Sequence, residues 1–378
     1  MTVALARKTL RYEWRRFLPA ILAVGFAGLL QLLQAALVLG IFGSASIYIT
    51  GSTADLWASY PGTQSVSLGQ PIDRDVAMHL YMDPAVTRVE PFDWVDGNWL
   101  GPHGGGGVAV FVCGIDPNAD GMMFARDLSP ALRERLKQPD AIIVDQADLG
   151  TLGIKLGETA RINGRQVRVV GISHGLRALG GVNVITSLDT ARQLDDDPED
   201  SGRMTFYLAK LRDPAQAAAV AQRLRGAGGF GPYTVWTAQD FARRSQMYWI
   251  LDTGAGAGVL FLAGIVFLVG AVITSQTLVA AVVGSIREYA TLNALGVGVW
   301  ALRRVVMEQA FWVGLIGLAG SVVLCALLLA LGRSYDVPVA LDPLTALACL
   351  ALGMGLAIVS GLAAMRSLRR ADPASLLR

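Results

Sequence analysis

Four long apolar segments divide the chain. Each lacks charged residues and has at least the roughly 20 residues that a helix needs to cross a bilayer. They are Phe17–Phe42, Gly254–Gly284, Gln309–Leu331 and Leu344–Met365. The stretch between the first and second segments has an ordinary soluble composition and is long enough for a folded domain with its own core. The pattern therefore predicts a membrane α-helical protein with four transmembrane helices and one large inserted domain.

Composition supports a membrane location for these segments. The chain is 53% hydrophobic and 16% charged, whereas soluble domains carry roughly 25% charged residues. The net charge of +2 gives no strong basic field that would attract nucleic acid. The first apolar segment is longer than the apolar core of a signal peptide, and no clear cleavage site follows it. We expect it to remain as a membrane anchor.

Basic residues collect before the first apolar segment, between the second and third, and after the fourth. They are Arg7, Lys8, Arg11, Arg15 and Arg16, then Arg287, Arg303 and Arg304, and finally Arg366, Arg369, Arg370 and Arg378. The large domain instead contains the acidic run Asp195–Asp200. Because Lys and Arg mark cytoplasmic flanks, we expect both termini and the second–third loop in the cytoplasm and the large domain outside.

These patterns give the expected organisation of the chain. It runs from a cytoplasmic interfacial helix (1–16) through transmembrane helix 1 (17–44), the outer domain (45–250), transmembrane helix 2 (251–284), a cytoplasmic coupling region (285–308), transmembrane helix 3 (309–332), an outer loop (333–343) and transmembrane helix 4 (344–365) to a cytoplasmic tail (366–378).

The two ends of the large domain share one pattern of strands and helices. Predicted strands are Ser65–Leu68, Val86–Trp94, Met204–Lys210 and Tyr233–Thr237, and predicted helices are Ile72–Met82 and Pro214–Arg225. Two strand–helix–strand units of this kind predict one α+β subdomain of porter-like, split βαβ type. The following segment, Ala238–Asp252, is predicted to be a helix that runs directly into the second span. The run Gly254–Gly258 weakens a helix there and marks either a hinge or a close approach of helices.

A mostly β insertion, about 101–202, lies between the two halves of this subdomain. Its predicted strands are Val108–Cys113, Ile142–Val144, Glu158–Ile162, Gln166–Ile172 and Val182–Thr186. Asn163 and Gly164 predict a tight hairpin, because this pair adopts the positive φ angles that such a turn needs.

The sequence contains no recognisable nucleotide-binding or metal-binding motif. No G-x-x-x-x-G-K-[ST] motif occurs, so we expect no bound nucleotide. His79, His103 and His174 are scattered, and we expect neither a metal site nor a bound cofactor. The three cysteines, Cys113, Cys325 and Cys349, are best explained as small buried hydrophobic residues.

Three stretches resemble the MacB/FtsX-like family of ABC transporter permeases. They are Leu152–Thr159 followed by Val167–Ile172, Arg287–Gly296 followed by Glu308, and Asp372–Arg378. The resemblance implies a permease subunit in the inner membrane of a bacterial cell, with a periplasmic domain and a homodimeric assembly. It also implies a separate ABC ATPase that uses ATP and Mg, and a periplasmic adaptor (membrane fusion protein) with an outer-membrane channel.

Within this family the chain is most similar to DevC-type exporter permeases. The similar residues are Leu18–Ala20, Gln31 and Gln34, Asp55–Trp57 and Pro61–Gly62. This similarity implies export of a glycolipid or another lipid. The chain departs from the family pattern at Asn293, where Arg is common.

The coupling region contains one amphipathic pattern. Ile286, Tyr289, Leu292 and Leu295 recur at helical spacing, and Gly296 ends the predicted helix. The resemblance implies that this helix docks into a groove of the ATPase, with Arg287 and Glu288 at the rim. The alternative is a helix that rests on the membrane surface.

Gln31 and Gln34 lie on one face of the first span, near Gly25 and Gly28. Buried amides in hydrocarbon need a partner. This face is either a dimer seam with a second copy or a packing surface within one protomer.

The four apolar segments contain no Asp, Glu, Lys, Arg or His, so transport driven by an ion gradient is disfavoured. Mechanotransmission, in which movement of the ATPase reaches the outer domain, fits these spans better. Three alternatives remain: extraction of lipids or lipoproteins, an FtsX-like signalling scaffold that activates an envelope hydrolase, and a receptor without an ATPase. The cargo has no recognisable signature in the sequence.

Overall fold

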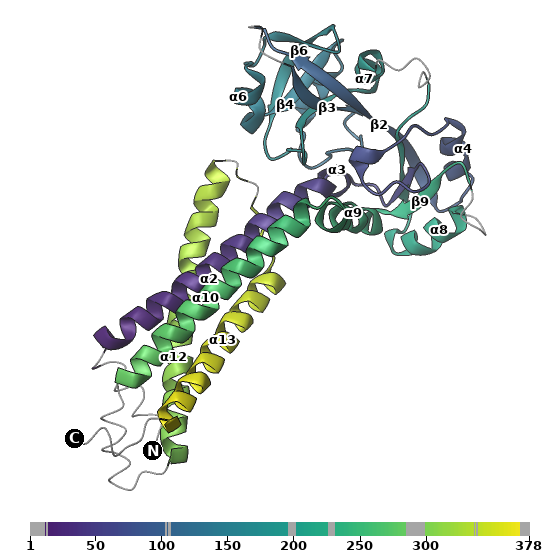
Figure 1. Cartoon of the computed structure of the whole chain (residues 1–378). Coiled ribbons are helices and arrows are strands. Elements are labelled where there is room, and N and C mark those ends of the chain that lie inside the picture. Colours follow the sequence, from purple (N-terminus) through teal and green to yellow (C-terminus); the bar gives the residue numbers. More distant parts are fainter. Residues whose placement is uncertain are drawn as a thin grey trace. The chain divides into compact units, whose positions relative to one another are not determined.

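The computed structural model describes residues 12, 14–102, 104, 107–195, 202–225, 231–284, 299–335, 337 and 339–370. The chain forms two compact units (Figure 1). One, the membrane-helix unit, comprises the residues up to Gly40 and from Ala257 onward. The other, the 41–256 domain, comprises Ile41–Gly256.

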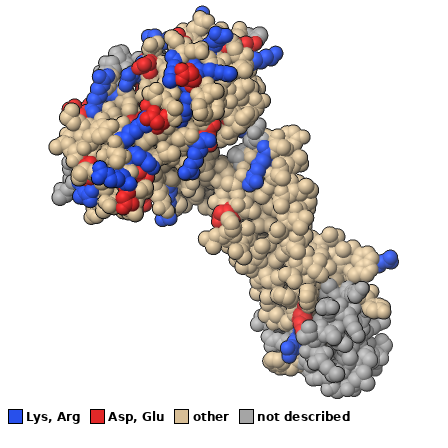
Figure 2. Space-filling model, turned by 180° about the vertical axis from the view of Figure 1, so that it is seen from behind, with Lys and Arg blue, Asp and Glu red and all other residues tan. Residues whose placement is uncertain are grey.

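Four long helices form the membrane-helix unit. They are α2 (Trp14–Gly43), α10 (Ala255–Gly284), α12 (Val299–Ser334) and α13 (Pro343–Arg370). All four are long and apolar enough to cross a membrane, which confirms the four predicted apolar helices. In Figure 2, charged side chains are frequent on the 41–256 domain and sparse along these helices. The predicted interfacial helix and the end of the tail lie largely outside the described residues.

Helices α2, α12 and α13 pack together around shared apolar residues. One cluster joins Phe17 and Val24 of α2 to Val313 of α12 and Ala357 of α13. A second cluster continues this contact toward the other end of the helices. Helix α10 contributes to neither cluster, and 11% of its most apolar window is buried, against 39% for α12. Most of the α10 surface therefore has no partner within the described part of the unit.

The 41–256 domain is built on one large sheet. Its strands are β1 (Leu56–Ser59), β2 (Val86–Leu100), β3 (Val108–Ile115), β4 (Ala141–Asp145), β5 (Thr159–Ile162), β6 (Arg165–Ser173), β7 (Val182–Ser187), β8 (Phe206–Leu211) and β9 (Thr234–Thr237). They follow the order β3-β7-β4-β6-β5-β2-β8-β1-β9, and β2 also pairs with β3. The pairing from β2 through β3, β7, β4, β6 and β5 back to β2 therefore closes the inserted strands into a barrel.

The described residues of the barrel interior are apolar and include aliphatic side chains and one tryptophan. Among them are Trp99 of β2, Val112 of β3, Val144 of β4 and Val184 of β7, all almost fully buried. The β5–β6 turn has positive φ angles at Asn163 (49°) and Gly164 (78°), which confirms the predicted hairpin.

The rest of the sheet forms the second part of the domain. Strand β8 lies between β1 and β2 and is antiparallel to both. Helices α4 (Asp75–Tyr81) and α8 (Ala217–Leu224) pack on these strands through a separate apolar cluster. Two short helices, α5 (Pro130–Leu136) and α7 (Leu188–Leu194), belong to the inserted segment.

One predicted strand in this part is wrong, and one observed strand was not predicted. Ser65–Leu68 is not a strand, because Val66–Leu68 forms a 3₁₀ turn and the Val66 amide donates to the Ser245 hydroxyl at 3.3 Å instead of joining a ladder. The first strand of the first strand–helix–strand pattern is instead β1. It was not predicted from the sequence, because all four of its residues are buried and show no polar–apolar alternation.

The predicted continuous helix into the second span is also wrong. Helix α9 spans Ala238–Met247, a π-helical turn follows at Tyr248–Asp252, and α10 begins only at Ala255. Gly254 between them has a φ angle of 72°, which a right-handed helix cannot contain. The helix is therefore interrupted where the sequence places its glycine-rich run.

Candidate functional site

The predicted coupling residues lie outside the described part of the chain. Residues 285–298 are not described, so Ile286, Arg287, Glu288, Tyr289, Leu292, Leu295 and Gly296 have no structural account here. Two other sets of residues are described: those at the contacts between the long helices, and those in the first and last segments of the 41–256 domain.

The predicted seam of α2 faces another helix of the same chain. A Cβ atom at Gly25 would lie 3.1 Å from the carbonyl oxygen of Gly317, and one at Gly28 would lie 2.7 Å from Leu318, both in α12. These two glycines therefore support the alternative of packing within one protomer. Gln31 lies close to Gly353 of α13, and its Oε1 atom is buried without a hydrogen-bond partner among the described residues. Gln34 is half-buried.

Two segments connect the 41–256 domain to the flanking long helices along the chain. The entering segment, residues 44–53, contains a 3₁₀ turn (Ser44–Ser46) and helix α3 (Ile47–Thr50). The leaving segment, residues 238–252, contains α9 and the π-helical turn. Helix α9 packs directly against the 3₁₀ turn and α3. The two segments therefore form one packed element of the domain, although they are almost 200 residues apart in sequence.

Buried polar contacts hold these segments in register. Gln246 Nε2 donates to Ser46 Oγ at 2.9 Å, which joins the leaving segment to the entering one. Ser245 Oγ donates to Ser65 Oγ at 3.0 Å, and Trp249 Nε1 donates to the same oxygen at 3.2 Å. Ser245 is completely buried. Ser65 lies outside the entering segment, so its two bonds fix the leaving segment to the turn at Val66–Leu68, whereas the Gln246–Ser46 bond joins the two segments. Unsatisfied buried groups are costly, so these bonds favour one position of the leaving segment.

An aromatic cluster lies beneath the two segments. Trp57 of β1 contacts Phe92, Phe206 and Phe241, with ring centroids 5.6 to 5.8 Å apart. Tyr48 of the entering segment lies 6.2 Å from Phe92. Rings at these separations add specific packing to the burial of their area, so the entering segment and α9 are anchored to the same core.

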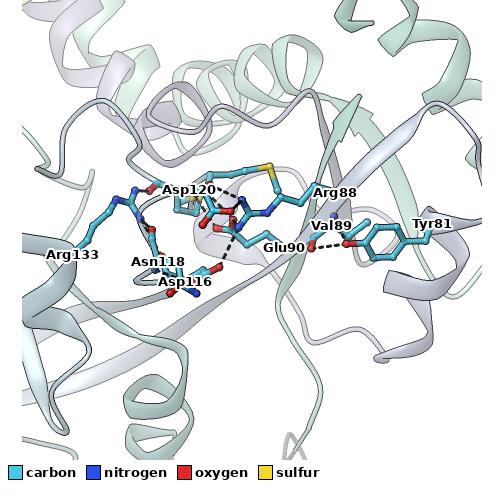
Figure 3. Close-up of polar contacts among 10 residues, drawn as sticks. Tyr81, Arg88, Val89, Glu90, Asp116, Asn118, Asp120 and Arg133 are labelled. Atoms are coloured by element: carbon cyan, nitrogen blue, oxygen red, sulfur yellow. Dashed lines mark hydrogen bonds and ion pairs between the residues drawn. The ribbon is translucent and has the colours of Figure 1, made fainter. Parts of the chain in front are cut away.

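A polar network lies on the inserted part of the domain (Figure 3). Its centre is Glu90, an almost fully buried residue of β2. Arg88 forms ion pairs with Glu90 and Asp116 at 3.2 Å each and with Asp120 at 2.6 Å. Burial raises the pKa of Glu90, against the opposing effects of the Met122 amide and the Arg88 charge. Burial lowers the pKa of Arg133, against the opposing effects of the charges of Glu90, Asp116 and Asp120.

This network holds a connection that we call the strap, residues 116–127, between β3 and α5. Glu90 accepts hydrogen bonds from the amides of Met122 at 2.7 Å and Met123 at 3.4 Å. Arg133 donates to the carbonyl oxygens of Asp116 at 3.0 Å and of Met123. Sequence reasoning missed these residues. The available signal was alternation, which places Glu90 on the same inward face of β2 as Phe92 and Trp94.

A polar cleft of about 710 Å³ lies elsewhere in the domain. Its lining includes Asp93, Asp96, Asn98, Asn163 and Arg203. Thr205 donates to Asp93 at 2.8 Å, and burial raises the pKa of this carboxyl. No three His, Cys, Asp or Glu side chains of the described residues come together as a set of metal ligands.

Comparison with known families matches nearly the whole chain. Residues 20–227, more than half of its length, match the MacB-like periplasmic core domain. Residues 260–373 match the FtsX-like permease C-terminal region. No curated protein matches the chain.

Three similar solved structures are extracellular or permease domains. They are the periplasmic region of MacB from Actinobacillus actinomycetemcomitans (14% identity, 52% of this chain and 94% of that one, TM-score 0.34), the extracellular domain of the noncanonic ABC-type transporter YknZ from Gram-positive bacteria (11%, 49% and 100%, 0.32), and a domain of a putative permease protein from Porphyromonas gingivalis (11%, 48% and 86%, 0.31). With both family regions matched in order, the chain belongs to the MacB/FtsX-like family of ABC transporter permeases, the membrane subunits of ABC transporters.

Proposed function

We propose that this permease works by mechanotransmission in an ATP-driven exporter. Its membrane helices carry the movement of a separate ABC ATPase to the 41–256 domain, which lies in the periplasm. The observation that supports this proposal is the packing of α9 against the entering segment, together with the hydrogen bond from Gln246 to Ser46 that joins the two segments. Because the entering and leaving segments form one packed element, a movement of either segment is passed to the whole domain.

The ATPase contact is assigned to the amphipathic pattern at 285–298. In the helix-in-groove mode, apolar anchors enter a groove of the partner and polar residues stay at its rim. Ile286, Tyr289, Leu292 and Leu295 are the anchors, and Arg287 and Glu288 are the rim residues. ATP and Mg are bound by the ATPase and not by this chain.

Leu292→Asp tests this assignment. A charge at an anchor position should abolish the stimulation of the ATPase by the permease and leave membrane insertion intact. Asn293→Asp adds the same charge one position away from the apolar pattern and should leave stimulation close to the wild-type value. Both variants are measured in proteoliposomes with the cognate ATPase. Unchanged stimulation in Leu292→Asp would remove the coupling role.

The assembly is assigned as a homodimer in the bacterial inner membrane with both termini in the cytoplasm. The exposed surface of α10 supports a second copy, because its large side chains, such as Phe261 and Leu268, are mostly uncovered in one protomer. We assign the dimer seam to α10 instead of to the α2 face, for which a seam was one of two alternatives, because the glycines of α2 face α12 of the same chain.

The cargo is assigned to the lipid or glycolipid class on the DevC-type similarity of the first span and the residues that follow it. Export then needs a periplasmic adaptor and an outer-membrane channel. Copurification from native membranes separates this assignment from the others. An adaptor and channel support export, a lipoprotein carrier supports extraction, and a cell-wall hydrolase supports an FtsX-like signalling scaffold.

A further inference from the structure

The strap connects the inserted barrel to the entering segment. The amide of Thr53, at the end of the entering segment, donates to the carbonyl oxygen of Met122 at 3.0 Å. The ring of Phe124 lies 6.2 Å from the ring of Tyr48. A Cβ atom at Gly51 would lie 3.0 Å from the same phenylalanine, so the two segments approach closely there.

The strap is held by side chains instead of by a strand ladder. Glu90 binds two consecutive amides from the β2 side, and Arg133 binds the carbonyl oxygens of Asp116, Asn118 and Met123 from the α5 side. The strap itself contains turns and no strand or helix. Segments held by a few side-chain contacts open locally at lower free energy than the central strands of a sheet. Arg88 adds ion pairs to Asp116 and Asp120, so three polar side chains make the polar attachment of the strap.

Several features of the closed strap favour its release. The Glu90 residue is 2% exposed, and an ionised group in that position loses hydration that opening would restore. Phe124 has a φ angle of 49°, which is unfavourable for a residue with a bulky side chain. In the opposite direction, Met122, Met123 and Phe124 bury their side chains in the domain core. The free-energy difference between the closed and open strap therefore depends on the balance between the cost of burying Glu90 and straining Phe124 and the gain from burying the apolar side chains.

We propose that the strap is a releasable latch, closed by Glu90 and Arg133, that ties the entering segment to the inserted barrel. When the latch is closed, the barrel follows the entering segment through Thr53, Gly51 and Tyr48. When it opens, the barrel is freed from the entering segment while the sheet and α9 stay intact. This inference goes beyond the proposed function, and its test requires no ATPase.

Hydrogen exchange of the full chain in nanodiscs tests the latch directly. The amides of Thr53, Met122 and Met123 are all hydrogen-bonded in the closed state. They should exchange together, at least about tenfold faster than the amide of Leu208 in the buried strand β8. Exchange at the same rate as Leu208 would show that the strap opens only when the whole domain unfolds, and it would overturn the proposal.

A variant pair identifies the residue that closes the latch. Glu90→Ala removes the acceptor of two amides and should raise their exchange rates by a further factor of about ten. Glu134→Ala is the matched control, because Glu134 is an exposed acid of α5 that pairs only with Lys137 among the described ion pairs. Unchanged exchange at Met122 and Met123 in Glu90→Ala would overturn the role of Glu90. If this variant does not fold, the wild-type comparison with Leu208 still decides whether the strap opens.

Discussion

Single glycines of α12 have different roles although they recur regularly in the sequence. Gly314 faces Met354 and Ala357 of α13, whereas Gly317 faces the backbone of α2. Gly320 faces open space, because a Cβ atom at this position would have no neighbour within 4 Å among the described residues. Contacts made by backbone atoms cannot give way as a flexible side chain can, so the position of each glycine determines what a substitution costs.

Gly317→Ala should destabilise the membrane-helix unit by about 1–3 kcal/mol, because the new methyl group would lie 2.8 Å from the carbonyl oxygen of Ile21. Gly320→Ala, in the same helix, should change stability by less than about 0.5 kcal/mol. Thermal unfolding of both variants in one detergent measures the difference. Equal melting temperatures would contradict the close approach of α2 and α12.

The buried carboxyl of Glu90 should make the stability of the 41–256 domain depend on pH. Its pKa is raised by burial, so the folded domain binds the Glu90 proton more tightly than the unfolded chain does. The stability from this proton is fully present below the ordinary carboxyl pKa of 4.5 and is lost as the pH rises through the raised pKa. The charged side chains around this carboxyl are Arg88, which forms an ion pair with it, Arg133, and the strap acids Asp116 and Asp120, which also pair with Arg88.

Glu90→Gln should therefore flatten the dependence of stability on pH in that interval. The amide cannot ionise, so the variant should be less stable relative to the wild type at low pH than at high pH. Tryptophan fluorescence melts from about pH 4 to about pH 8 measure this difference. Glu134→Gln at an exposed site is the control. Parallel curves for Glu90→Gln and the wild type would contradict a raised pKa.

At the scale of elements, α10 differs from the other three long helices. Its apolar side chains are exposed over most of its length, and it approaches α2 closely where Gly270 meets Ala27. A Cβ atom at Gly270 would lie 3.1 Å from that of Ala27. A helix exposed to this extent has a large apolar surface left for lipid or a second copy.

Disulfide formation across this surface tests the dimer. In a variant without native cysteines, Leu268→Cys in α10 should form a covalent dimer when membranes are oxidised. Leu347→Cys in α13 is a matched control, since the two leucines are 63% and 65% exposed. Dimers through position 347 and none through position 268 would contradict a seam along α10.

Most elements could be predicted from the sequence because their burial follows a regular pattern. The four spans are continuous apolar runs, and the Asn163–Gly164 hairpin has a specific turn chemistry. Strand β1 could not be predicted, since it is short and buried on both faces. Closure of the barrel depends on β2, which pairs with β8 along its first half and with β3 along its second. Such long-range pairing leaves no local signal.

The candidate site was less accessible to sequence reasoning than the fold. The contact between Gln246 and Ser46 joins residues far apart in the chain, and neither residue type identifies its partner. The interruption before α10 could be placed at the glycine-rich run, but the π-helical turn that precedes it could not. The roles of Gly25 and Gly28 depended on which helix faces them, and only the three-dimensional structure supplies that information.

At the scale of the whole molecule, the two regions matched by family models can be compared with the two compact units. The FtsX-like match, residues 260–373, falls within the membrane-helix unit, and the MacB-like match, residues 20–227, covers most of the 41–256 domain together with most of α2. The proposed transmission of movement requires that residues 285–298 and the 41–256 domain lie on opposite sides of the membrane.

Labelling of single cysteines in spheroplasts with a membrane-impermeant maleimide measures this arrangement most directly. In a variant without native cysteines, Glu134→Cys places the thiol on an exposed part of the 41–256 domain, and Asn293→Cys places it in the coupling region. The account predicts that position 134 is labelled in intact spheroplasts and that position 293 is labelled only after the membrane is permeabilised. Labelling of both positions in intact spheroplasts, or of neither, would contradict it.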